Sequence, residues 1–197
     1  MGRFFASVAT LLLLCGLSLG QSSKDRFEVF GGYSLVTGDF TGTFADRSTH
    51  ILNGWNASAN YKASPLLGLV ADFSGFHAGY TYPGIGGLTV SANSLAVLFG
   101  PQVSLQLSRV TPFAHVLLGV THIGYPQSSG CPGCSASSAN AFSYAFGGGI
   151  DYYLTPHVGI RGQADLLHNG FSNADNQLTY KYHELNARIS AGVVFRF

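Results

Sequence analysis

Apolar residues alternate with small or polar residues through most of the chain beyond residue 25. This period of two is the signature of a β-strand, because successive side chains of a strand point to opposite faces of the sheet. Seven segments follow the alternation clearly: Phe27–Leu35, Trp55–Tyr61, Leu67–Phe73, Leu95–Val103, Phe142–Tyr152, Val158–Leu166 and Leu185–Phe197. The pattern therefore predicts an all-β protein.

An eighth strand is predicted from Pro112 to Ile123, although that segment is apolar at both sets of alternate positions. We expect His115, Gly119 and Thr121 to form its inner face. Pro101 interrupts the fourth strand because proline has no amide hydrogen for the ladder. We therefore expect a β-bulge at Pro101.

The segments between the predicted strands alternate in length. Short turns fall at 63–65, 108–111 and 154–157, and long connections rich in Gly, Ser, Thr and Asn fall at 37–51, 77–91, 124–141 and 168–182. Eight strands joined alternately by short turns and long connections predict an antiparallel up-and-down β-barrel. Tight turns on the periplasmic side and longer outer loops are typical of bacterial outer-membrane barrels.

Composition helps to decide which face of the strands points outward. Only 10% of the residues are charged, against about 25% in a soluble domain. This is too few charged residues to cover the exterior of a soluble barrel. The polar face consists mostly of small residues, which fit the narrow interior of eight strands. Aromatic residues mark both ends of the apolar face, as in membrane barrels: Phe27, Tyr61, Tyr152, Phe195 and Phe197 near the turns, and Trp55, Phe73 and Phe142 near the loops. We expect the apolar face to be outside.

The charges nearly balance, with 10 Lys and Arg against 9 Asp and Glu, which argues against nucleic-acid binding.

The N-terminus has the pattern of a secretory signal peptide. Arg3 precedes an apolar run that contains Cys15, and Ser18 and Gly20 are small residues before a cut at Gln21. We expect a signal peptide at 1–20 and one barrel domain at 21–197, which has no apolar run long enough for a transmembrane helix.

The last strand carries the most specific signal. It runs through Gly192 to aromatic residues at Phe195 and Phe197. This ending resembles the assembly signal of the outer-membrane β-barrel family of OmpA and OmpX type. The glycine-rich run at 147–152 and the alternating Arg161, Gln163 and Asp165 also fit that family. The resemblance implies insertion into outer-membrane lipid by the barrel-assembly machinery. It implies a non-enzymatic role in envelope structure or surface recognition. We expect no cofactor.

Nine charged residues fall on the predicted inner face, and their signs nearly balance. Two interpretations remain open: an ion path or gate lined by opposed charges, or a plug of hydrogen-bonded ion pairs that fills a narrow lumen. The nine residues are Glu28, Lys62, Asp72, Asp151, Arg161, Asp165, Glu184, Arg188 and Arg196. A small gated channel for ions or solutes is therefore an alternative function.

Cys131 and Cys134 lie in the third long connection. An exported protein favours a disulfide for such a pair, over a redox motif, which needs a thioredoxin-like context, or half of a zinc site. Five histidines lie in or beside the long connections: His50, His77, His122, His168 and His183. They lack tight ligand spacing, so no metal site is predicted.

Aromatic and aliphatic residues in the long connections form two candidate contact surfaces for a ligand. Alternatively, the strands extend beyond the membrane there and these side chains pair across them. The residues are Tyr80, Tyr82, Pro83, Ile85 and Leu88 in one connection, and Tyr180 and Tyr182 in another. A lipid-modifying enzyme is a further alternative, but His183 and Glu184 are adjacent and point to opposite faces, so no catalytic triad is predicted.

Overall fold

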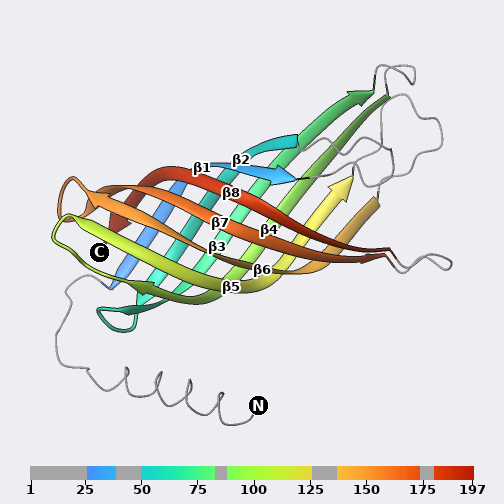
Figure 1. The fold of residues 1–197 in the computed structure, drawn as a ribbon. Helices are drawn as coiled ribbons and strands as arrows, with labels where there is room; N and C mark the ends of the chain where they lie inside the picture. Colours follow the sequence, from blue (N-terminus) through green and yellow to red (C-terminus); the bar gives the residue numbers. More distant parts are fainter. Residues whose placement is uncertain (1–25, 39–49, 83–87, 126–136, 174–179) are drawn as a thin grey trace, which may run out of the picture.

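The computed structural model describes residues 26–38, 50–82, 88–125, 137–173 and 180–197. These residues form one closed antiparallel barrel with the strands in sequence order (Figure 1). The strands are β1 (Phe27–Gly38), β2 (His50–Lys62), β3 (Leu67–Tyr82), β4 (Leu88–Ser104), β5 (Val110–Tyr125), β6 (Ser137–Tyr153), β7 (Val158–Asn173) and β8 (Tyr180–Arg196). Within these ranges no helix is long and apolar enough to cross a membrane.

Pairing between β1 and β8 closes the barrel. The stagger of the barrel can be followed along one row of paired residues. The row starts at Arg26, whose carbonyl accepts from the Lys62 amide on β2. From Lys62 it continues through one residue on each of the strands β3 to β7 and reaches Arg188 on β8. Arg188 then pairs with Val36 on β1. A circuit of the barrel therefore shifts the register by ten residues, from Arg26 to Val36. Such a stagger accompanies the strand tilt that closes a barrel.

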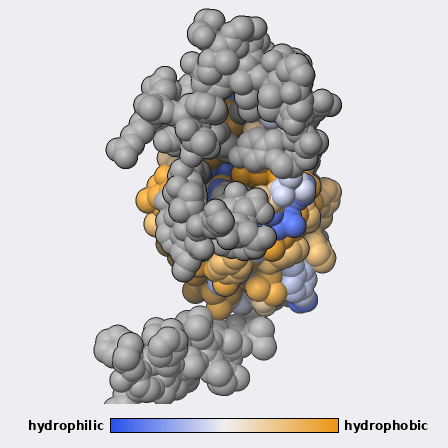
Figure 2. Space-filling view, turned by 90° about the vertical axis from the view of Figure 1, so that its right-hand side faces the viewer, coloured by the Kyte–Doolittle hydropathy of each residue, from blue (hydrophilic) through white to orange (hydrophobic). Residues whose placement is uncertain are grey.

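The apolar set of each strand faces outward, as the sequence predicts. Figure 2 looks at the barrel from the end opposite the short turns, and most of the coloured barrel surface in that view is hydrophobic. Both groups of aromatic residues are exposed on this face: Phe27, Tyr61, Tyr152, Phe195 and Phe197 near the turns, and Trp55, Phe73 and Phe142 farther along the strands. The predicted inner residues of β5 also lie as expected, with His115 and Thr121 buried.

Two predictions about the strands are wrong. The connection placed at 77–91 is mostly strand, because β3 and β4 stay paired as far as Tyr82 and Leu88. The connections at 124–141 and 168–182 shorten in the same way. Ladder hydrogen bonds join backbone groups, so pairing continues after the apolar pattern has ended. Pro101 causes no bulge: the β3–β4 register runs through it unbroken, and the β4–β5 ladder resumes in the same register at Gln102.

Both apolar and polar side chains are buried inside the barrel. The largest apolar cluster crosses five neighbouring strands and consists of Val70, Leu98, Leu117, Ala145 and Leu167. Phe30, Tyr153 and Val194 form a second cluster near the short turns. Val36, Leu52 and Phe76 form a third cluster. The remaining interior positions are largely polar or charged, and they carry the candidate site.

Candidate functional site

Seven of the nine charged residues assigned to the inner face are buried inside the barrel: Glu28, Lys62, Asp72, Asp151, Arg161, Asp165 and Arg188. Arg196 lies at the turn-side rim and is only partly buried. Glu184 pairs with Asn169 in the β7–β8 ladder, and its side chain lies outside the described part of the structure. The buried charges form two clusters at different levels of the barrel.

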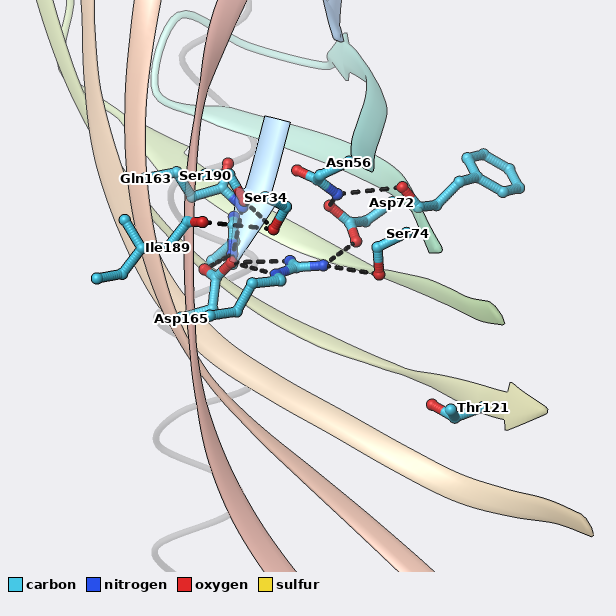
Figure 3. Close-up of polar contacts among 12 residues, drawn as sticks. Ser34, Asn56, Asp72, Ser74, Thr121, Gln163, Asp165, Ile189 and Ser190 are labelled. Atoms are coloured by element: carbon cyan, nitrogen blue, oxygen red, sulfur yellow. Dashed lines mark hydrogen bonds and ion pairs between the residues drawn. The ribbon is translucent and has the colours of Figure 1, made fainter. Parts of the chain in front are cut away.

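Arg188 is the centre of the first, which we call the middle cluster. Its guanidinium is fully buried, with 0% exposure. Nη1 lies 2.8 Å from Asp72 Oδ1 on β3, and Nη2 lies 2.7 Å from Asp165 Oδ2 on β7. Nη1 also donates to Ser74 Oγ at 3.1 Å. Figure 3 shows Asp72 and Ser74 approaching from one side and Asp165 from the other. One side chain therefore connects opposite walls of the lumen.

Neighbouring polar groups complete the middle cluster. The Asn56 amide donates to Asp72 Oδ2, and the Gln163 amide donates to Asp165 Oδ2, both at 2.8 Å. His115 Nε2 lies 2.8 Å from Asp165 Oδ1. Each carboxylate thus has several partners, as a buried charge requires.

Gly147 makes the contact between His115 and Asp165 feasible. The three residues are neighbours in one register row, on β5, β6 and β7. A Cβ at Gly147 would collide with Asp165 Oδ1 and with the Ala164 carbonyl oxygen. Because glycine leaves this space free, the carboxylate reaches across the middle strand to the imidazole.

Glu28 and Arg161 belong to the second cluster, which we call the turn-side cluster. Glu28 Oε1 lies 2.5 Å from Lys62 Nζ and also accepts from the Tyr153 hydroxyl at 2.9 Å. Arg161 Nε and Nη2 bind both oxygens of Asp151, at 2.6 and 2.8 Å. Arg161 Nη2 is also 4.0 Å from Glu28 Oε2, which links the two ion pairs.

Aromatic rings pack against the cations at this level. The Arg161 guanidinium carbon lies 4.4 Å from the Phe113 ring centroid and 5.2 Å from that of Phe30. At the rim, the Arg196 guanidinium carbon lies 4.1 Å from the Tyr153 centroid. Arg196 also donates to the Pro156 carbonyl. Such ring contacts stabilise a desolvated cation by about 2 kcal/mol.

The charges almost cancel within each cluster. The turn-side cluster has two carboxylates and two cations, and the middle cluster has two carboxylates, Arg188 and His115. Three buried amide oxygens accept no hydrogen bond from the described residues, namely Asn56 Oδ1, Asn60 Oδ1 and Gln102 Oε1, and His115 Nδ1 has no hydrogen-bond partner among them. Buried acceptors of this kind usually bind water.

Sequence reasoning placed His115 on the inner face but did not include it, or Tyr153, in the charge network. Both follow the same alternation as the charged residues, so the period of two by itself places their side chains inside the barrel. Their partners depend on register, which the alternation does not provide.

The three residues of the proposed assembly signal lie on or beside the closing seam. Gly192 pairs with Gly32 across the seam. Phe195 points outward. The Phe197 amide and carbonyl both bond to the backbone of Phe27, at 2.8 and 3.1 Å. The end of the chain therefore completes the barrel wall.

Several other candidate residues lie outside the described residues, namely the predicted signal segment, Cys131, Cys134, Pro83 and Ile85. Tyr80 and Tyr82 belong to β3, Leu88 to β4, and Tyr180 and Tyr182 to β8, as expected if the strands extend beyond the membrane. In the described ranges no three His, Cys, Asp or Glu side chains form a group that could hold a metal ion.

The chain matches the family model of the outer membrane protein beta-barrel domain over residues 6–197. No curated protein matches it. Solved structures with the same fold include Ail of Yersinia pestis in complex with the heparin analogue sucrose octasulfate (TM-score 0.58, 16% identity, 88% of this chain and 99% of that chain). Others are Neisserial surface protein A (0.60, 14%, 87% and 97%) and OprG of Pseudomonas aeruginosa (0.53, 12%, 88% and 96%).

Proposed function

The chain belongs to the outer membrane protein β-barrel domain family and resides in the cell outer membrane, and we propose that it acts there as a non-enzymatic barrel with a sealed lumen. Its role is then structural, or lies in recognition at the cell surface. The lipid-facing wall would hold the exposed connections in place, and the interior would serve stability rather than transport.

The fully buried Arg188 carries this proposal. It is bound to Asp72 on one wall and to Asp165 on the other, so the lumen is bridged at its middle. The turn-side cluster and its aromatic rings form a second barrier. An ion moving through the barrel would have to break buried ion pairs at both levels, at several kcal/mol for each.

Surface recognition is the finer part of the proposal. A sealed barrel offers its partners only its outer surface and its exposed connections, where scaffold proteins usually carry binding residues. Ail, which shares the fold, was solved in complex with a heparin analogue. That complex is consistent with a barrel of this architecture serving as a binding platform.

Single-channel recording in a planar bilayer tests the sealed lumen. We expect the wild-type protein to insert, as judged by its folded gel mobility, and to give no stepwise conductance. Arg188→Ala and Arg161→Ala should each remain silent, because the other cluster still blocks the lumen. The double variant should conduct. Regular steps from the wild-type protein would overturn the proposal.

A small gated channel is the second candidate, and the three buried amide oxygens without a partner among the described residues favour it. If they bind water, the lumen is partly hydrated between the clusters, and a rearrangement of Arg188 could connect the two sides. Under this alternative the wild-type protein conducts, and Arg188→Ala alone changes the conductance. The same recording therefore separates the two functions.

A further inference from the structure

Polar side chains lie on the outward face of five consecutive strands, just beyond the apolar band and away from the short turns. We call them the polar belt: Asn53, His77, Asn93, His122 and Asn140 on β2 to β6, all of them exposed. Two residues closer to the turns, the outward positions are largely apolar: Trp55, Leu95, Val120 and Phe142. The belt therefore begins where the apolar band ends.

The distance from the turn-side end of the barrel places the belt at a membrane surface. On β5 the outward face runs from Pro112 to His122. At about 3.3 Å per residue and a tilt of about 40°, this stretch spans about 25 Å, the height of the apolar band of outer-membrane barrels. Since the short turns of such barrels face the periplasm, the belt lies among the headgroups of the outer leaflet.

Two His–Asn pairs repeat the same geometry on successive hairpins. His77 Nδ1 lies 2.7 Å from Asn93 Oδ1, and His122 Nδ1 lies 2.7 Å from Asn140 Oδ1. Both pairs join residues directly opposite in register, with the histidine on β3 or β5 and the asparagine on the next strand. Asn53 Oδ1 accepts from the Tyr33 hydroxyl at 2.6 Å, which extends the polar surface to β1.

The pairing determines which polar groups remain for a ligand. An amide oxygen only accepts, so the imidazole Nδ1–H donates, and the neutral ring keeps Nε2 as an acceptor. The asparagine keeps its NH₂ group as a donor. If the amide is turned over, NH₂ donates to Nδ1, and Nε2–H and the amide oxygen remain. In either arrangement each pair offers one donor and one acceptor.

A sugar hydroxyl matches this surface, because it both donates and accepts. A phosphate diester offers only acceptors, and no Lys or Arg side chain lies on the belt among the described residues. We propose that the polar belt binds the saccharide headgroups of outer-leaflet glycolipid. This binding is independent of whether the lumen conducts.

The chain's single tryptophan, Trp55, provides the reporter. It is 49% exposed on β2, two residues from Asn53. The wild-type protein is reconstituted in phosphatidylcholine vesicles with a rising fraction of lipopolysaccharide truncated to its inner sugars, and Trp55 emission is recorded. We expect a saturable spectral shift. Phosphatidylmethanol, an anionic phosphodiester whose headgroup has no hydroxyl, should give no shift in the same range; an equal response to it would overturn the saccharide assignment.

The double variant H77L/N93L removes the polar groups of one pair and replaces them with apolar side chains of similar size. Because two hydrogen bonds are lost, the midpoint of its titration should move at least about fivefold toward higher lipopolysaccharide. Leu118→Ala, at an exposed outward position within the apolar band, is the matched control and should keep the wild-type midpoint. All variants must show folded gel mobility. An unchanged midpoint in a folded H77L/N93L protein contradicts the proposal.

Discussion

Glycine at position 147 shows how a single residue determines contacts two strands apart. Asp165 and His115 are on β7 and β5, and the strand between them has no side chain at that level. The carboxylate that bonds His115 is also the one that Arg188 binds. The middle cluster therefore depends on the absence of a Cβ at position 147 as much as on the charges themselves.

Substitution Gly147→Ala tests this dependence. The new Cβ would collide with the Asp165 carboxylate and with backbone, so we expect the free energy of unfolding to fall by about 1–3 kcal/mol. Gly162→Ala is the matched control on the neighbouring strand, because a Cβ there meets nothing within 4 Å. Its effect should stay within about 0.5 kcal/mol. Urea unfolding in detergent, followed by Trp55 fluorescence, measures both; equal midpoints would refute the role of Gly147.

At the scale of elements, β8 combines three roles in one strand. Its outward residues extend the apolar wall as far as Phe195, its inward Arg188 binds both carboxylates of the middle cluster, and its edge pairs with β1. We propose that the assembly machinery recognises this same strand, as the resemblance to the family implies.

Phe197→Ala separates recognition of the terminal strand from stability. Its backbone bonds to Phe27 remain possible in the variant, so refolding in detergent should change little. In cells we expect severalfold less folded protein in the outer membrane. Phe27→Ala, which removes the exposed aromatic ring on the other side of the seam, should assemble normally. Folded levels measured by gel mobility in membrane fractions test this, and equal losses for both variants would exclude a special role for Phe197.

At the scale of the whole molecule, the buried charges act as braces across a closed ring. Arg188 connects β8 with β3 and β7, and Glu28 on β1 connects with Lys62 on β2 and Tyr153 on β6. Because each of these two side chains contacts strands that are not all neighbours, its removal should affect the cooperative unfolding of the whole barrel rather than of one hairpin.

Arg188→Met leaves two buried carboxylates without their cation. We expect the global free energy of unfolding to fall by about 3–5 kcal/mol, with the transition remaining a single step. The triple variant R188M/D72N/D165N removes the charges together and should recover most of the loss. Urea titration with two probes, fluorescence and circular dichroism, tests both statements. A triple variant as unstable as Arg188→Met would show that charge imbalance is not the cause.

The sequence by itself determined the strands and the orientation of their faces. Alternation with a period of two assigns each side chain to one face, and the scarcity of charge makes the apolar face the outer one. It was enough to place Asp165 and Arg188 inside. The extent of pairing beyond the apolar band and the behaviour of Pro101 were mispredicted, because both depend on backbone bonds with a neighbouring strand.

Only the tertiary structure decided which of these residues meet. Asp72 and Arg188 are 116 positions apart in the chain, and no local pattern relates them. They meet because the ring closes with a shift of ten residues, from Arg26 to Val36. The His–Asn pairs of the polar belt likewise require the register of β3 with β4 and of β5 with β6. Parity is a property of one strand, whereas register and stagger belong to the closed sheet.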